Sequence, residues 1–250
     1  MSFVVKRLFV LTGAGVSAES GLATFRGEGG VWKQYRAEEV AHINAWRRDP
    51  KLVWEFYSFR RRKHHEVTPN PAHHALAELE RRLGDGFFLC TQNVDRLHEL
   101  AGSVRVAHIH GKIFESKCDT CAREPFYDES THDDGAPLPR CECGPGRIRP
   151  NVVWFGEALP EKELARTFAE LDRCDCFIAV GTSGVVEPVA SFVRHIKLRR
   201  QNDEGRTIQT LYVGPEHPAN AEYFDDFYLG TAGEMLPHLI AERFPAISSP

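Results

Sequence analysis

The sequence predicts an α/β fold, with a doubly wound parallel sheet and a smaller inserted lobe, from three observations. Short apolar runs alternate with helical segments, which indicates βαβ units. A glycine turn, Thr12-Gly13-Ala14-Gly15, follows the first apolar run, as in Rossmann-like sheets that bind a nucleotide at their edge. Four cysteines, Cys118, Cys121, Cys141 and Cys143, interrupt the alternation and indicate a metal-held lobe.

The elements follow in order along the chain. Buried strands are predicted over Arg7–Thr12, Phe87–Thr91, Val104–His108, Phe177–Val180 and Ile208–Val213, with a loop over Gly13–Gly30. Asp49-Pro50 and Asn70-Pro71 each pair an N-cap residue with proline at the first helical position. Asp49-Pro50 predicts a helix that runs through about His64, and Asn70-Pro71 predicts a helix that ends at Gly84. A third helix is predicted over Glu161–Leu171.

Residues 112–150 differ in character from their surroundings, being rich in cysteine, proline, glycine and acidic residues with little periodicity. We therefore expect one domain with two lobes. The large Rossmann-like lobe takes about residues 1–25, 70–112 and 151–250. The small lobe takes a helical insertion, about 26–69, and a zinc ribbon, about 113–150.

Composition excludes several classes of protein. The 250 residues are 42% apolar and 26% charged, which is ordinary for a globular protein with a core of normal size. A net charge of −4 gives no basic field for nonspecific nucleic-acid binding, and no apolar run approaches the ~20 residues of a membrane span. The N-terminus enters a strand at once, which leaves no room for a signal peptide. Seven cysteines, four at metal spacing, favour a reducing, cytoplasmic compartment.

The glycine turn by itself has two interpretations. Gly13 and Gly15 permit close backbone approach to a pyrophosphate, but they suit a tight strand–helix connection equally well. The dehydrogenase pattern G-x-G-x-x-G is absent, because the next glycine is Gly21. Glu38 and Glu39 lie near the distance of the acidic residue that such enzymes need, but in a segment that looks helical.

The cysteine quartet predicts one structural Zn²⁺. Two residues separate Cys118 from Cys121 and one separates Cys141 from Cys143, so two knuckles can close a tetrahedral site with no open position. Disulfides are the alternative, disfavoured in a reducing compartment. The second C-x-C, Cys174 and Cys176, is interpreted as buried core thiols.

Polar residues follow three strands of the predicted sheet. Gln92, Asn93 and Asp95 come after one strand and His110 after the next, where ligands of doubly wound folds bind. His110 is either a general base or a structural histidine. Gly181-Thr182-Ser183, after a later strand, offers amide and hydroxyl donors for a phosphate. The pairs His64/His65 and His73/His74 are interpreted as surface or packing residues.

Taken together, seven stretches resemble the sirtuins, the NAD-dependent protein-lysine deacylases, and in particular their bacterial desuccinylase and demalonylase members. They run in family order over nearly the whole chain. They are Gly13-Ala14-Gly15-Val16-Ser17, Thr24-Phe25-Arg26-Gly27, Thr91-Gln92-Asn93-Val94-Asp95, His110-Gly111, the cysteine quartet, Val152-Val153-Trp154-Phe155-Gly156-Glu157 and Gly181-Thr182-Ser183.

The resemblance implies NAD as cofactor and assigns roles to residues. His110 would be the general base, with Asn93 as the second catalytic residue. NAD would be bound by Gly13, Ala14, Gly15, Ser17, Ala18, Thr24, Phe25, Arg26, Trp32, Gln92, Asn93, Asp95, Gly181, Thr182, Ser183, Gly214, Glu216 and Ala232. Gly214 stands where relatives carry an asparagine toward the adenosine ribose, so backbone groups of Gly214 and Glu216 would replace it.

The partners implied are acylated proteins or peptides bound as an added strand. Their contacts would be Ala37, Tyr57, Arg60, Val153, Trp154, Phe155, Gly156, Glu157, Val185, Val186 and Glu187. No membrane or specific nucleic-acid partner is expected, and a monomer is compatible with the sequence. In the implied reaction, the acyl-lysine oxygen attacks the anomeric ribose carbon as nicotinamide leaves. His110 deprotonates a ribose hydroxyl, and the acyl group migrates to give O-acyl-ADP-ribose and free lysine.

The expected acyl group is dicarboxylic. Tyr57 and Arg60 are three residues apart on a predicted helix, so they share a face, and an arginine fork beside a phenol can bind a carboxylate. Spacing alone also suits a solvated basic face, since Arg61, Arg62 and Lys63 follow. However, Tyr57-Ser58-Phe59-Arg60 and the small Ala37 resemble the sirtuins that remove succinyl, malonyl and glutaryl groups. We expect desuccinylase and demalonylase activity, with some deacetylase activity.

Two other functions compete with a deacylase. A nicotinamide-dependent oxidoreductase would need the missing G-x-G-x-x-G turn. A zinc-ribbon binding module would carry basic and aromatic residues around its cysteines, whereas this lobe carries Asp128, Glu129, Asp133 and Asp134, which repel phosphate.

Overall fold

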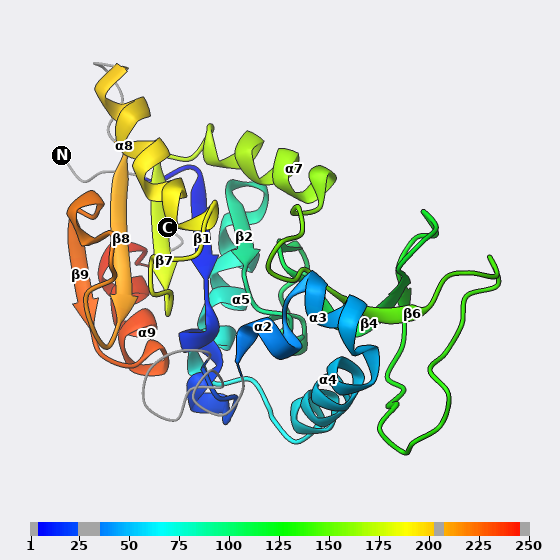
Figure 1. Ribbon diagram of the computed structural model, residues 1–250. Helices are drawn as coiled ribbons and strands as arrows, with labels where there is room; N and C mark the ends of the chain where they lie inside the picture. The colour runs from blue at the N-terminus through cyan, green and yellow to red at the C-terminus, as the bar shows by residue number, and fades with distance from the viewer. Residues whose placement is uncertain (1–4, 25–35, 203–207, 246–250) are drawn as a thin grey trace.

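A six-stranded parallel sheet forms the larger part of the computed structural model, which describes residues 5–24, 36–202 and 208–245 (Figure 1). The strand order is β3-β2-β1-β7-β8-β9, and every neighbouring pair is parallel. The strands are β1 (Leu8–Thr12), β2 (Phe87–Thr91), β3 (Val106–His108), β7 (Cys176–Val180), β8 (Gln209–Gly214) and β9 (Asp226–Leu229). The order reverses direction at β1, so the predicted doubly wound sheet is confirmed.

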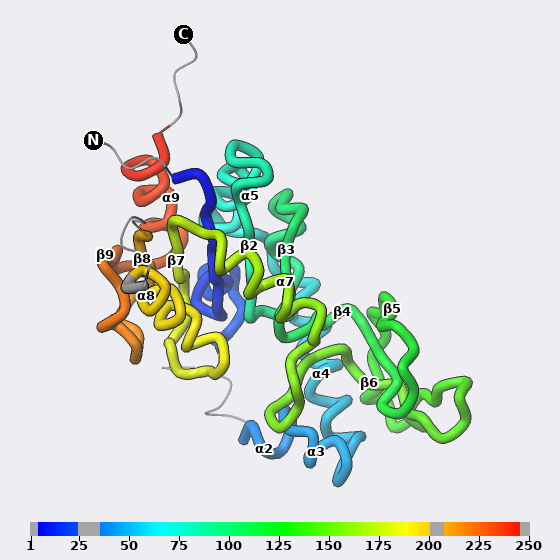
Figure 2. Tube along the Cα trace, turned by 90° about the horizontal axis from the view of Figure 1, so that it is seen from above, coloured from blue at the N-terminus to red at the C-terminus, as the bar shows by residue number. Residues whose placement is uncertain are grey.

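Helices cover both faces of this sheet, as Figure 2 shows from above. Helices α5 (Pro71–Leu83) and α9 (Ala232–Arg243) pack on one face, against Leu8 and Val10 of β1. Helices α7 (Glu161–Leu171) and α8 (Phe192–Asn202) pack on the other, against Phe9 and Leu11. Successive residues of β1 thus enter opposite cores, which is why this strand is apolar throughout. None of the helices in the described ranges is long and apolar enough to cross a membrane.

The smaller part of the fold combines three helices with a second sheet (Figure 1, lower right). The helices are α2 (Ala37–Val40), α3 (Ile43–Arg48) and α4 (Pro50–His65), and the sheet, in the order β5-β4-β6, has β4 (Gly111–Cys118), β5 (Phe126–Tyr127) and β6 (Ile148–Val152). One core joins them through Trp46, Trp54, Ile113, Phe114 and Trp154. The proposed lobe boundaries stay a prediction, although this core contains residues from both expected insertions.

The helix start and stop signals act as the sequence predicts. The Asp49 side chain accepts a hydrogen bond from the N–H of Leu52, and the Asn70 side chain from that of Ala72. His73 completes a capping box at α5 by accepting from the N–H of Asn70. Gly84 ends α5 with φ of 53°, a conformation that favours glycine. These local interactions are readable from sequence because all partners lie within four residues.

Other elements differ from the prediction. The loop expected over Gly13–Gly30 is wrong for its first part, where the 3₁₀ helix η1 (Ala14–Ser20) continues β1. Residues 113–150 contain strands that their irregular pattern concealed, because β4 carries a register shift against β6. Helix α8, strand β9 and helix α9 were not predicted, and Pro237 inside α9 breaks the expected helical pattern. The remaining short elements are η2 (Gly84–Gly86), α6 (Leu97–Leu100), η3 (Val189–Ser191) and η4 (Ala221–Tyr223).

Candidate active site

The turns after β1, β2 and β7 meet at the carboxyl edge of the large sheet. The N–H of Gly13 donates to the carbonyl of Val180 at 2.9 Å, and the N–H of Gly15 donates to that of Gly181 at 2.9 Å. A Cβ on Gly15 would lie 2.7 Å from the Cα of Gly181, so only glycine lets these turns approach so closely. The packing of the two turns against each other therefore requires glycine at position 15, whether or not a ligand binds there.

A buried polar network lies behind these turns. The Ser17 hydroxyl donates to Asp95 Oδ2 at 3.0 Å and accepts from Asn93 Nδ2 at 3.1 Å. His73 Nε2 lies 3.4 Å from the same hydroxyl. Because His73 Nδ1 accepts from the N–H of Asn70, its proton is on Nε2, and His73 donates to Ser17. Burial raises the pKa of Asp95, while the hydrogen bonds from Leu97 N–H and Ser17 oppose that shift.

His110 follows β3 at the same edge. Its Nδ1 lies 3.0 Å from the carbonyl oxygen of Gln92, which can only accept, so the proton is on Nδ1. The lone pair of the neutral ring is then on Nε2. Burial lowers the pKa of His110 from its ordinary 6.5, and the hydrogen bond to Gln92 opposes part of the shift. The ring is therefore neutral at pH 7 and able to accept a proton at Nε2.

The remaining residues expected around NAD come from the segments that follow β1, β2, β7, β8 and β9. Gln92 Nε2 donates to the Thr182 hydroxyl at 3.0 Å, and the Gly214 carbonyl accepts from the N–H of Gly230. Ser183, Glu216 and Ala18 are exposed, Ala14 and Thr24 are half-buried, and buried Ala232 begins α9. Phe25, Arg26 and Trp32 lie outside the described residues.

The segment expected to receive a peptide is largely bonded within the chain. The N–H of Val153 donates to the carbonyl of His110, and Phe155 exchanges hydrogen bonds with Ala41 and Ile43. Glu157 is held by both terminal nitrogens of Arg149 and accepts from the N–H of Trp154. Trp154 is buried, whereas Gly156 and the Phe155 side chain, 43% exposed, face solvent. Glu157 thus fixes the conformation of this segment through hydrogen bonds within the chain.

The second segment expected to receive the peptide follows β7. The Val185 side chain is 48% exposed. The Val186 carbonyl accepts from the N–H of Ala190, and Glu187 Oε2 accepts from the Ser191 hydroxyl at 2.7 Å. These contacts anchor the base of the segment and leave the apolar Val185 side chain toward solvent.

Tyr57 and Arg60 lie together on α4, as their spacing predicts. Tyr57 is buried, its hydroxyl accepts from Trp154 Nε1 at 2.9 Å, and burial raises its pKa to about 12. Arg60 is half-buried, and desolvation lowers its pKa while the charges of Tyr57 and Asp95 oppose the shift. The guanidinium is therefore within electrostatic reach of the Ser17–Asn93–Asp95 network. Ala37, the small residue expected beside them, begins α2.

The four quartet cysteines come together at the tip of the small sheet. Their Sγ atoms all lie within 4.8 Å of one another, and the distances Cys118–Cys143 and Cys121–Cys141 are both 3.8 Å. A tetrahedron with Zn–S bonds of about 2.3 Å places its sulfurs about 3.8 Å apart. Cys118 Sγ accepts from the N–H groups of Thr120 and Cys121, which stabilise a thiolate. All seven cysteines of the chain are free thiols, so the geometry fits a structural Zn²⁺ rather than disulfides.

Removing one ligand should release the metal and destabilise the fold. We expect Cys118→Ala to lower the bound zinc from one per chain toward zero and the unfolding midpoint by about 10 °C, since a structural site contributes several kcal/mol. Elemental analysis and thermal unfolding measure the two effects. Cys90→Ala, at a buried thiol of β2, is the control that should keep its zinc. Stoichiometric zinc in Cys118→Ala would refute the site.

The sequence does not indicate that three buried histidines lie near the residues of this edge. The sequence favours a surface or packing role for His73, and the packing alternative is confirmed, since His73 is fully buried and contacts Ser17. His98 Nε2 lies 3.0 Å from the Thr12 hydroxyl, and His108 Nε2 lies 2.7 Å from Glu99 Oε1. The only local signal was the position of His73 in the capping box of α5. The contacts of His73 with Ser17 and of His98 with Thr12 join residues far apart in sequence, and His108 and Glu99 are nine residues apart.

Comparison with known proteins identifies the family. A model of the Sir2 family matches residues 13–188. A protein of Pyrococcus furiosus named NAD-dependent protein deacylase is 48% identical, over 92% of this chain and 90% of its own length. A solved Sir2 homologue–NAD complex superposes with a TM-score of 0.84 at 42% identity, over 95% of this chain and 89% of that one. A structure described as Sir2 bound to acetylated peptide gives 0.79 at 28% identity, over 95% and 93%. The chain that folds in this way and carries these residues at its sheet edge belongs to the Sir2 family.

Proposed function

We propose that this protein is an NAD-dependent protein deacylase that removes acyl groups from lysine side chains, preferring succinyl and malonyl over acetyl groups. One observation carries the deacylase assignment: the neutral His110, with its lone pair on Nε2, lies at the same sheet edge as the Ser17–Asn93–Asp95 network. The family match, the solved relative in complex with NAD and the relative bound to acetylated peptide support the two substrates.

The residues at the sheet edge would have separate roles in the reaction. When bound, NAD would supply the ribose that receives the acyl group, so that NAD, acyl-lysine and one water would give nicotinamide, O-acyl-ADP-ribose and free lysine. The backbone of the Gly13–Gly15 and Gly181–Ser183 turns offers hydrogen bonds to the phosphates. Asn93 and Asp95, which Ser17 holds in place, would bind the nicotinamide-ribose end. His110 Nε2 accepts the proton of a ribose hydroxyl, and the Gln92 carbonyl stabilises the protonated ring.

The acyl preference rests on Tyr57 and Arg60. A half-buried guanidinium three residues from a buried phenol on the same helix can hold a carboxylate with charge-assisted hydrogen bonds. The basic residues that follow belong to other contacts: Arg61 is buried, Arg62 pairs with Asp133, and Lys63 pairs with Glu66. A solvated basic face therefore describes Arg62 and Lys63, which are exposed, but not the half-buried Arg60.

The proposal extends to the metal, the partner and the location. Zn²⁺ at the four cysteines would be structural, because four protein ligands leave no open position. The peptide would lie between residues 153–157 and 184–187, where Phe155 and Val185 expose apolar side chains. Seven free thiols suit a reducing, cytoplasmic compartment. An oxidoreductase or a noncatalytic zinc-ribbon module lacks comparable support, since the family match spans the glycine turn, His110 and the quartet.

A single assay tests the activity and its preference. Succinyl-, malonyl- and acetyl-lysine peptides of one sequence are incubated with NAD, and mass spectrometry follows nicotinamide and O-acyl-ADP-ribose. We expect both products in equal amounts, only when acylated peptide is present, with a higher kcat/KM for the two acidic acyl groups. Peptide-independent nicotinamide release would contradict the deacylase assignment. A preference for acetyl would contradict only the acyl assignment.

A further inference from the structure

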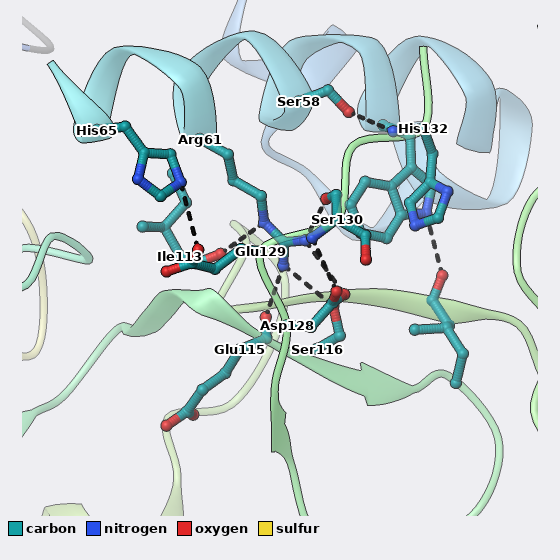
Figure 3. A network of polar contacts seen from close by, with 12 residues as sticks. Ser58, Arg61, His65, Ile113, Glu115, Ser116, Asp128, Glu129, Ser130 and His132 are labelled. Carbon is teal, nitrogen blue, oxygen red and sulfur yellow. Dashed lines mark hydrogen bonds and ion pairs between the residues drawn. The ribbon is translucent and has the colours of Figure 1, made fainter. Parts of the chain in front are cut away.

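Arg61, the residue next to Arg60, is the most completely bonded buried cation in the described part of the chain. Its side chain is fully buried, and Figure 3 shows it extending from α4 onto β4 and the segment after β5. Nε donates to the Ile113 carbonyl at 2.8 Å. The two terminal nitrogens donate at 2.6–3.1 Å to Asp128 Oδ2, the Ser130 and Glu115 carbonyls and the Ser116 hydroxyl. A buried guanidinium with this many partners has one orientation only.

The acceptors of Arg61 are themselves held in place. The Ser116 hydroxyl donates to Asp128 Oδ2 at 2.5 Å, and the N–H of Ser130 donates to Asp128 Oδ1 at 2.9 Å. The carboxylate of Asp128 therefore joins β4 to the segment beyond β5, and Arg61 joins both to α4. The guanidinium also stacks on Trp54, with its Cζ 5.1 Å from the ring centroid.

Further contacts fasten the same face of α4 to the small sheet (Figure 3). Trp54 Nε1 donates to the carbonyl of Ile148, which pairs with Cys118 across β4 and β6. The Ser58 hydroxyl accepts from the N–H of His132 at 2.8 Å. These contacts come from the turns of α4 that also carry Tyr57 and Arg60, so the placement of this pair depends on the small sheet.

We propose that Arg61 is a positioning residue for acyl recognition, which holds the Arg60 guanidinium at the place where a dicarboxylic acyl group binds. The inference rests on the proposed acyl preference. Five donors in a planar fork fix both the height and the rotation of the helix, whereas a lysine in this place would keep the charge for Asp128 but lose the fork. A small rotation of α4 would move the Arg60 guanidinium away from the carboxylate, whereas the hydrogen bonds that hold His110 and the Ser17–Asn93–Asp95 network involve no residue of α4. Arg61 therefore acts on acidic acyl groups selectively.

The test compares Arg61→Lys with its neighbour Arg62→Lys, which alters an exposed ion pair with Asp133 and is the matched control. We expect Arg61→Lys to raise the KM for succinyl peptide about tenfold, because misplaced binding groups lose most of their effect. The kcat and KM for acetyl peptide should stay within about twofold, and Arg62→Lys should match the wild type. Asp128→Asn, which weakens the same contact from the other side, should show a smaller change in the same direction.

A double variant separates positioning from mere stability. If Arg61 acts through Arg60, then Arg60→Met and Arg60→Met/Arg61→Lys should have the same succinyl kcat/KM within about twofold. Additive losses in the double variant, or parallel losses on succinyl and acetyl peptides, would overturn the positioning role. If Arg60→Met leaves the acyl preference unchanged, the proposed preference and this inference both fail. If only Arg60→Met is selective, this inference alone fails.

Discussion

Replacing His110 with alanine is expected to reduce kcat/KM for every acyl peptide by about 10²–10⁴-fold, the usual contribution of a general base. The loss should be the same for succinyl, malonyl and acetyl substrates, because the proton removed belongs to the ribose and not to the acyl group. Mass spectrometry of O-acyl-ADP-ribose measures it directly. Binding of NAD should change little, since the Ser17–Asn93–Asp95 network does not include His110 in its hydrogen bonds.

The pH dependence of the wild type tests the same assignment. A general base works only in its unprotonated form, so activity falls as the pH drops through its pKa. Burial lowers the pKa of His110 below 6.5, so the acid limb of kcat/KM should lie below pH 6.5. An acid limb above that value would assign the base to another group.

His195→Ala is the control for His110→Ala. His195 lies on α8 and pairs with Asp172 at the surface, so its loss should leave kcat and KM unchanged. Comparable activity losses in the two variants would indicate a general sensitivity to histidine removal. Full activity of His110→Ala would refute its role outright.

Arg60→Met should reverse the acyl preference. Methionine keeps much of the length and apolar stem but removes the guanidinium, and a charge-assisted hydrogen bond contributes about 1.5–3 kcal/mol. We therefore expect kcat/KM for succinyl and malonyl peptides to fall by about ten- to a hundredfold. The value for acetyl peptide should stay within about threefold, because an acetyl group presents no carboxylate. Steady-state kinetics on the three peptides measures the ratio.

Tyr57→Phe and Arg62→Met accompany this experiment. Tyr57→Phe removes the phenol hydroxyl that accepts from Trp154 Nε1 but keeps the Arg60 guanidinium. We therefore expect it to lower succinyl turnover less than Arg60→Met does. Arg62→Met removes a nearby exposed charge and should leave the preference unchanged. Equal losses on succinyl and acetyl peptides in Arg60→Met would show that Arg60 supports the fold or the common reaction rather than the acyl chain.

Local patterns in the sequence were sufficient for much of the fold. The apolar runs around β1, β2 and β7, the caps at Asp49 and Asn70, and the stop at Gly84 are interactions between neighbours, so short windows contain all of their partners. The cysteine spacing likewise predicted the cluster, because a tetrahedral site needs two short knuckles and little else. The sheet edge followed from the rule that parallel strands present their carboxyl ends together.

Tertiary structure alone decided the partners of the buried polar groups. Nothing near His73 in sequence indicates Ser17, and nothing near Arg61 indicates Asp128 and Ser116, since these contacts join segments dozens of residues apart. Glu157, which we expect at the peptide, also pairs with Arg149 eight residues earlier in the chain, a contact that no local pattern in the sequence indicates. Sequence by itself determined the alternation of strands and helices, the cysteine cluster and the family, because these depend on spacing. The partner of each buried charge depends on the tertiary fold, because a buried charge must be paired and packing decides which residue lies beside it.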